Sequence, residues 1–255
     1  MLEREAKLVV TGERPEVVAD EIAGLVHLAG RGLQDVGTLE IRDVYLDTPT
    51  GALRARGDSL RLRVQDGRPL LTLKGPGRDV GSGVSERNEV ETPWSADAYV
   101  RCLDALSVRG VSLRRVTPGD DPVASLLASG LSRVQERETN RRRRDVDGAG
   151  TRVAELAIDE VTYRIAGGPV RHHEVEIEAK APEGNQYLAR AVEELRARFG
   201  PALTPWRHGK LAIGLGIERL LASAAGPALV AGGHLTPAAY PRLAALLNGE
   251  DAPPD

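Results

Sequence analysis

The feature that most constrains this chain is a set of short stretches in which apolar residues alternate with charged residues of a single sign. Residues 59–65 read Ser-Leu-Arg-Leu-Arg-Val-Gln, and residues 174–178 read Glu-Val-Glu-Ile-Glu. A period of two residues predicts β-strands, because successive side chains of a strand point to opposite faces. Each strand would then carry a row of like charges on one face, where neighbouring charges repel each other. Folding therefore requires something of opposite charge beside each row.

These rows allow two interpretations. In the simpler one, each strand buries its apolar side and turns its charged side to water. A solvated face usually mixes charges of both signs, however, so rows of one sign favour strands that enclose a charged ligand. Carboxylates suit Mg²⁺ or Mn²⁺, whereas arginine and lysine suit phosphate oxygens. A complex of a metal ion with a polyphosphate would match both kinds of row.

Strand patterns recur along most of the chain, and turn signals such as Asp66-Gly67 and Gly167-Gly168 separate several of them. The expected strands cover residues 3–10, 41–47, 59–65, 69–75, 85–91, 133–144, 153–159 and 171–179. The expected helices cover residues 15–31, 96–109, 121–130, 184–199 and 208–223. Many strands joined by tight turns predict an antiparallel sheet or barrel. If the charged faces converge inside a barrel, the helices at 15–31, 96–109 and 184–199 are available to cover the apolar outer faces.

Length and composition bound the organisation of the chain. At 255 residues it is long enough for one large domain, and we expect residues 1–215 to form it. The chain then becomes rich in Ala, Gly, Leu and Pro, with few charged residues before Glu250. We therefore expect residues 216–255 to form a helical C-terminal appendage or tail.

The charge and the apolar content exclude several classes of function. A net charge of −3 argues against binding of nucleic acid, which needs a surplus of clustered cations. The sequence contains no run of about 18 apolar residues and no signal-peptide pattern at its start, so we expect a cytoplasmic protein without a membrane partner. The single cysteine, Cys102, lies in an apolar stretch and is interpreted as a core residue.

Several motifs together resemble one known family. Glu3-Arg4-Glu5-Ala6-Lys7 is similar to the Glu-x-Glu-x-Lys signature of CYTH proteins, the triphosphate tunnel metalloenzymes. Further stretches resemble the family's motifs in the family's order, at residues 45–49, 60–63, 71–74, 87–89, 157–161 and 174–178. The resemblance spans about residues 3–210. It implies an α+β fold with an eight-stranded antiparallel β-barrel, whose charged interior is a triphosphate tunnel and whose outside is covered by several helices.

The resemblance also implies a divalent metal ion, Mg²⁺ or Mn²⁺, and a set of site residues. The implied metal ligands are Glu3, Glu5, Glu174, Glu176 and Glu178. The implied substrate-binding residues are Lys7, Arg61, Arg63, Lys74, Arg141, Arg143 and Lys210. Among these residues, Glu5, Lys7 and Lys74 are the expected catalytic residues.

Two stretches of the sequence, an arginine run and a pair of histidines, allow more than one interpretation. The family has one functional arginine in the stretch that reads Glu-Thr-Asn-Arg-Arg-Arg-Arg here, at residues 138–144. Strand parity with Thr139 favours Arg141 and Arg143, while the alternative is that most of this run is solvated. His172 and His173 are adjacent and would point to opposite faces of a strand, so only one could serve a single site, and a structural or exposed role is the simpler interpretation.

Within this family, we expect metal-dependent hydrolysis of inorganic triphosphate, because the sequence shows no aromatic-rich patch for a base or a thiazole ring. Adenylate cyclase and thiamine triphosphatase are the enzymatic alternatives. A non-catalytic module that binds polyphosphate or a nucleoside triphosphate is the alternative from another class. The expected partner is inorganic triphosphate or another small molecule with a triphosphate group, and the oligomeric state stays open between a monomer and a homodimer.

Overall fold

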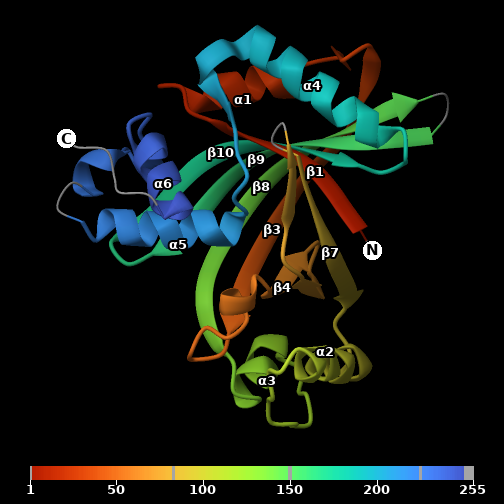
Figure 1. Cartoon of the computed structure of the whole chain (residues 1–255), viewed down its shortest axis with the longest axis vertical. Helices are drawn as coiled ribbons and strands as arrows, with labels where there is room; N and C mark the ends of the chain where they lie inside the picture. The colour runs from red at the N-terminus through yellow and green to blue at the C-terminus, as the bar shows by residue number, and fades with distance from the viewer. Residues whose placement is uncertain (1, 82–83, 149–150, 224–225, 250–255) are drawn as a thin grey trace.

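The fold is an α+β arrangement of one large sheet and flanking helices, seen in a computed structural model that describes residues 2–81, 84–148, 151–223 and 226–249 (Figure 1). The strands are β1 (Leu2–Val10), β2 (His27–Leu28), β3 (Arg31–Asp47), β4 (Ser59–Gln65), β5 (Arg68–Lys74), β6 (Arg78–Gly81), β7 (Val84–Pro93), β8 (Ser132–Gly148), β9 (Thr151–Ile165), β10 (Gly168–Ala179), β11 (Leu203–Pro205), β12 (Val230–Ala231) and β13 (His234–Leu235). The α-helices are α1 (Pro15–Ala23), α2 (Ala96–Val108), α3 (Pro122–Ala128), α4 (Gly184–Phe199), α5 (Lys210–Leu221) and α6 (Ala239–Asn248). The predicted α+β class is confirmed.

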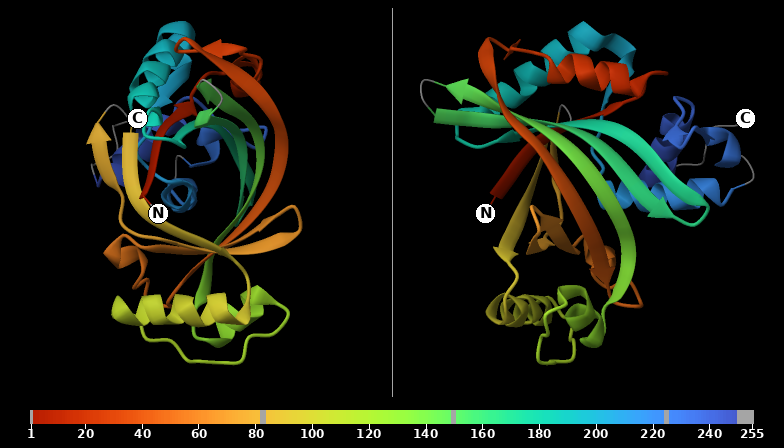
Figure 2. Two further views of the ribbon diagram at one scale, coloured as in Figure 1. Left: turned by 90° about the vertical axis from the view of Figure 1, so that its right-hand side faces the viewer. Right: turned by 180° about the vertical axis from the view of Figure 1, so that it is seen from behind.

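The eight longest strands pair in a closed ring, in the order β1, β7, β5, β4, β3, β8, β9, β10 and back to β1. Every neighbouring pair in this ring is antiparallel. Figure 2 shows the ring end-on in its left-hand view. The sheet as a whole is mixed, because β13 pairs with β10 in parallel outside the ring. The expected antiparallel arrangement therefore holds around the ring but not for the whole sheet.

Apolar side chains cover the outer face of the ring, as the alternation predicts. On one side α1 and α4 pack against β1, β9 and β10, where Leu8, Ile158 and Ile177 are fully or almost fully buried. On the other side α2 and α3 pack against β3, β4 and β5, where Leu60 and Leu73 belong to the buried cluster. In both clusters these apolar strand positions alternate with charged positions, so the charged faces are left to the interior.

Local signals set the ends of the helices. Ser95 caps α2 by accepting a hydrogen bond from the Ala98 N–H at 3.0 Å, and Asp121 caps α3 in the same way. The helix expected over residues 15–31 ends at Ala23, so its second half was predicted wrongly. Ala29 and Gly30 adopt positive φ angles of 49° and 75°, which form a two-residue turn between β2 and β3. A hairpin therefore replaces the last turns of the expected helix.

The C-terminal helices close one end of the interior. Helix α5 lies against Gln135 and Tyr163, which share the inward faces of β8 and β9 with the charged residues. The approach is so close that a Cβ atom on Gly214 would lie 2.0 Å from Gln135 Nε2 and 2.6 Å from Tyr163 Cδ1. Helix α6 packs on the far side of α5 within the same apolar cluster.

Helix α5 also spans residue 215, where the sequence suggested a boundary between a main domain and an appendage. Residues 216–249 hold the end of α5, then β12, β13 and α6. The division at residue 215 stays a prediction. In the part of the chain that the structure describes, no helix has both the length and the apolar character that crossing a membrane requires.

Candidate functional site

The inward faces of the ring enclose a cavity of about 610 Å³ whose walls are mostly charged. Odd-numbered residues of β1, β8 and β9 and even-numbered residues of β10 point into it, as the period of two requires. The sequence-predicted residues that line it are Glu3, Glu5, Lys7, Arg61, Arg63, Lys74, Arg141, Arg143, Glu176, Glu178 and Lys210. Glu174 is fully buried directly beside this set, where it contacts Lys7 and Lys210. The structure therefore brings all twelve predicted residues into one region.

A first group of charges lies where β1, β5 and β7 meet. Lys74 Nζ is 3.0 Å from Glu3 Oε2 and 2.9 Å from Glu89 Oε2. Arg87 donates from Nε to Glu3 and from one terminal nitrogen to Glu5, each at 2.9 Å. Because Glu3 and Arg87 are direct cross-strand partners, the register of β1 and β7 builds this network. The first-strand glutamates are thus held by cations of the neighbouring strands.

A second group lies deeper, where β8, β9 and β10 meet α5. Lys7 Nζ is 2.8 Å from Glu176 Oε1, and Lys210 Nζ is 2.7 Å from the same oxygen. Arg141 donates twice to Asp159, at 2.8 and 2.7 Å, and also contacts Glu176. Lys210 is the first residue of α5, so the helix that closes the interior also supplies a cation to it. Glu174 also contacts Lys7 and Lys210, so three cations face three carboxylates in this group.

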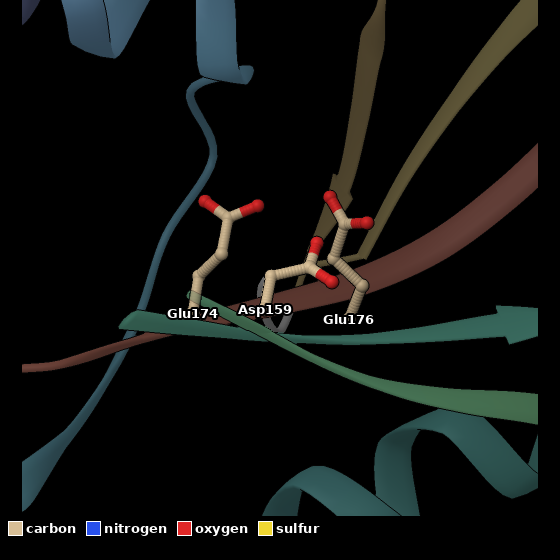
Figure 3. A group of neighbouring side chains, drawn as sticks. All are labelled: Asp159, Glu174 and Glu176. Carbon is tan, nitrogen blue, oxygen red and sulfur yellow. The ribbon is translucent and has the colours of Figure 1, made fainter. Parts of the chain in front are cut away.

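The three carboxylates of the second group, Asp159, Glu174 and Glu176, form a compact buried cluster. One oxygen from each lies within 4.8 Å of the others, and Figure 3 shows the three side chains rising from the same side of β9 and β10. Hard carboxylate oxygens are the ligands that Mg²⁺ and similar cations prefer. Among the described residues, no group donates a hydrogen bond to either oxygen of Glu174, although Lys210 contacts one of them as an ion pair. The donor set therefore fits a divalent cation.

The cations of this group lower the pKa values of its carboxyl groups. Burial alone would raise the pKa of Glu176, but Lys7 and Arg141 outweigh it and hold that pKa well below its usual value. Burial would likewise raise the pKa of Asp159, and Arg141 and Lys210 lower it. These two carboxyl groups are therefore anions at neutral pH, the state in which they bind cations.

A third group surrounds Asp43 on β3. Arg63 donates two hydrogen bonds to the Asp43 carboxylate, at 2.9 and 3.1 Å, and Arg137 donates one at 2.6 Å. Arg137 also donates to the Tyr45 hydroxyl at 2.8 Å and lies over its ring. Asp43 is completely buried, and the charges of Arg137, Arg63 and Arg61 overcome burial and hold its pKa well below the usual value. One carboxylate thus holds Arg61 and Arg63 of β4 and Arg137 of β8.

Successive arginines of β8 point alternately into the cavity and away from it. Arg141 and Arg143 line the cavity, whereas Arg142 points outward and pairs with Asp20 on α1 at 2.7 Å. The parity argument for residues 141 and 143 therefore agrees with their placement. Glu178 lies at a more exposed part of the wall and pairs with Lys180 at 2.6 Å. Burial outweighs Lys180 and raises the pKa of Glu178, whereas the neighbouring cations outweigh burial and lower the pKa of Glu176.

Sequence reasoning did not assign to the site several residues that the structure places in or beside the cavity. They are Asp43, Arg87, Glu89, Glu91, Arg137, Glu155 and Asp159. Three of them, Arg87, Glu89 and Asp159, stand inside motifs that the sequence analysis did recognise. Asp43 and Arg137 carry no single-sign row of their own, and only the pairing of β3 with β4 and β8 reveals their partners.

Comparisons with known proteins bear on the family and the fold of this chain. The family model of the CYTH domain matches residues 1–202. Among solved structures, the chain is similar to HpAC1 from Hippeastrum, a proposed adenylyl cyclase reported to have a dominant triphosphatase activity. That match has 18% identity and a TM-score of 0.54, and it covers 84% of this chain and 95% of that chain. This likeness supports the fold.

Two further solved structures are more distant. PH1819 from Pyrococcus horikoshii OT3 has 21% identity and a TM-score of 0.47, with 86% of this chain and 98% of that chain covered. The Pct1 RNA triphosphatase of S. pombe has 12% identity and a TM-score of 0.38, and the match covers 82% of this chain and 86% of that chain. A search of curated protein sequences found no significant match.

Proposed function

The chain belongs to the CYTH family, and from this premise we propose that it hydrolyses inorganic triphosphate with the help of Mg²⁺ or Mn²⁺. The observation that carries the proposal is one cavity of about 610 Å³ to which neighbouring strands supply both cations and carboxylates. A triphosphate bound to a metal ion is the small ligand that needs both. In this proposal the ring of strands is the wall of a triphosphate tunnel.

The basic residues bind the triphosphate. Arginine can form paired hydrogen bonds with phosphate oxygens, and lysine acts as a point charge. The proposed phosphate ligands are Lys7, Arg61, Arg63, Lys74, Arg141, Arg143 and Lys210, to which the geometry adds Arg87. Each of the best-placed cations already has a carboxylate partner, such as Glu3 for Lys74. Triphosphate would therefore exchange with carboxylates rather than meet uncompensated charges.

The acidic residues hold the metal and serve the attacking water. We assign Asp159, Glu174 and Glu176 as metal ligands, with Glu3, Glu5 and Glu178 as further carboxylates along the same wall. A divalent ion would neutralise charge on the phosphate oxygens and activate water. Glu5 is placed among the cations of β1 and β7, where its carboxylate can accept a proton from water aligned with the terminal phosphate. Phosphoryl transfer needs little else beyond positioning and charge.

The lining of the cavity favours inorganic triphosphate over an organic one. Among the described residues that line it, Tyr45 is the one aromatic residue, and Arg137 covers its ring. The described lining therefore offers a nucleobase or thiazole ring little aromatic surface to stack on. Adenylate cyclase, thiamine triphosphatase and a non-catalytic binding module remain the alternatives that the test must separate.

The test is phosphate release from tripolyphosphate with Mg²⁺, Mn²⁺ or a chelator, beside ATP and pyrophosphate. We expect metal-dependent cleavage with a preference for tripolyphosphate. Arg141→Ala should lower kcat by about 10²- to 10³-fold, as removal of one hydrogen-bond donor to the transition-state charge does in other enzymes. Arg142→Ala on the outer face of the same strand is the matched control and should retain activity. Binding without cleavage would indicate a sensor, and cyclic AMP formation from ATP would indicate a cyclase.

A further inference from the structure

His172 is a buried histidine that the proposed hydrolysis does not use. It lies on β10 two residues before Glu174, so its side chain shares the inward face with Glu174 and Glu176. The adjacent His173 points to the outer face, where its Nε2 lies 3.4 Å from Glu160 and its ring stacks on His234. Of the two histidines that the sequence places side by side, His172 is the one beside the acidic cluster.

The imidazole of His172 is held in one orientation. Its side chain is fully buried, and its ring stacks on Tyr163 with 5.7 Å between the ring centroids. Tyr163 in turn donates its hydroxyl proton to the Lys210 carbonyl at 3.0 Å. Tyr163 of β9, which is hydrogen-bonded to the first residue of α5, therefore packs against the His172 ring of β10.

Both ring nitrogens of His172 lack a hydrogen-bond partner among the described residues. A buried polar atom without a partner costs about 1–3 kcal/mol, so native proteins rarely leave one unless something else binds it. The two oxygens of Glu174 accept no hydrogen bond from the described residues either. An imidazole and a carboxylate that both lack hydrogen-bond partners among the described residues thus lie side by side in the interior, with Lys210 and Lys7 as ion-pair neighbours of the carboxylate.

The distance between them suits a shared ion. His172 Nε2 lies 3.7 Å from Glu174 Oε2, which is too long for a hydrogen bond. Two ligand atoms bound to one ion at about 2.0–2.2 Å lie roughly 3–4 Å apart. Lys210 contacts the other oxygen, Oε1, so the ammonium group leaves Oε2 facing the imidazole.

We propose that His172 and Glu174 form a mixed nitrogen and oxygen site for a divalent transition-metal ion, next to the carboxylates of Asp159 and Glu176. Imidazole binds Mn²⁺, Co²⁺ or Zn²⁺ more readily than Mg²⁺, which prefers oxygen ligands alone. The proposal rests on the proposed function only in locating the metal in this cavity.

The site predicts which metal binds best. Carboxylates alone would bind Mg²⁺ and Mn²⁺ through the same hard oxygens, with little to separate them. A nitrogen ligand from His172 shifts the preference toward Mn²⁺. Loss of this one ligand should weaken Mn²⁺ binding by at least about tenfold, within the 10–100-fold range that even indirect partners of metal ligands show. Mg²⁺ binding should change much less.

The experiment is Mn²⁺ titration of the full chain after removal of metals with a chelator, followed by electron paramagnetic resonance of free and bound Mn²⁺. Pulsed measurements on bound Mn²⁺ in the wild-type protein should detect a directly coordinated nitrogen. His172→Gln should lose that coupling and raise the Mn²⁺ Kd by about tenfold or more. His173→Gln removes the outward histidine and should leave both the nitrogen coupling and the Mn²⁺ Kd unchanged.

The wild-type spectrum tests the proposal even if His172→Gln does not fold. Bound Mn²⁺ without nitrogen coupling in the wild-type protein would overturn the proposal, and so would an unchanged Kd in a folded His172→Gln variant. Tripolyphosphate cleavage is a separate readout. Nitrogen-coupled Mn²⁺ in a protein that cleaves no tripolyphosphate would uphold this site while refuting the proposed hydrolysis.

Discussion

Replacement of Asp43 by asparagine tests whether one carboxylate holds the arginines of the cavity wall together. Asp43 is fully buried, accepts hydrogen bonds from Arg63 and Arg137, and has Arg61 at 3.9 Å. Asparagine keeps the shape but removes the charge, which leaves buried guanidinium groups without their counter-ion. Removal of one partner of a buried ion pair costs about 3–5 kcal/mol, because the remaining charge is uncompensated. We expect a loss of this size in the free energy of unfolding at pH 7.

The assay is urea unfolding followed by circular dichroism. With an m-value of roughly 2–3 kcal/mol/M for a protein of this size, the midpoint should fall by about 1–2 M. Asp97→Asn is the matched control, because Asp97 pairs with Arg101 on the exposed surface of α2 and should cost less than about 0.5 kcal/mol. A loss below about 1 kcal/mol for Asp43→Asn would refute the reasoning, since a buried counter-ion cannot be that dispensable.

The pH dependence provides a second check on the same substitution. The three arginines hold the pKa of Asp43 below its value in the unfolded chain, which is about 3.9. The carboxylate therefore contributes its full stabilisation above that pH, and the contribution is lost as pH falls through the lower native pKa. The difference between wild type and Asp43→Asn should accordingly be constant from pH 7 to 5 and shrink below about pH 4. A difference that grows toward low pH would contradict this sign.

Two further predictions address the core and the closed end of the ring. Burial raises the pKa of Cys102 to about 12, so iodoacetamide at pH 8 should alkylate it about 10³-fold more slowly than an exposed cysteine, with the normal rate returning in guanidinium chloride. Equal rates in the folded and unfolded protein would contradict the buried assignment. Gly214→Ala should cost about 1–3 kcal/mol through the clash with Gln135 and Tyr163, measured by thermal unfolding. Gly119→Ala, where a Cβ atom meets nothing within 4 Å, is its control.

The sequence predicted the charged rows well because strand parity alone decides which residues share a face. Arg141 and Arg143 illustrate this, since a period of two separates them from Arg142 without any knowledge of the neighbouring strands. The same argument fails for the helix expected over residues 15–31. Its apolar spacing continues to Leu28, but the positive φ angles at Ala29 and Gly30 favour a hairpin, and pairing with β3 overrides the helical pattern.

The partners of the charges could not be predicted in the same way, because they depend on register between strands. Asp43 stands directly opposite Arg63 on β4 and Arg137 on β8. Asp159 likewise stands opposite Arg141 on β8 and Glu174 on β10. A one-residue shift of either pairing would send these side chains to different faces. The sequence of one strand does not determine its register with its neighbours. The sequence therefore predicted rows of charge but not the clusters that the rows form.

The ion pairs inside the cavity determine what binding a ligand costs. Triphosphate alone would take Lys7, Arg141 and Lys210 from their carboxylates. Glu176 and Asp159 would then be left as unpaired buried anions. A metal ion alone would take those carboxylates and leave the cations unpaired. Each ligand therefore removes the cost that the other creates, and by linkage each must raise the affinity of the cavity for the other by the same factor. The alternation of single-sign rows, which first set this chain apart, thus favours a ligand that enters as a metal–triphosphate complex over either component alone.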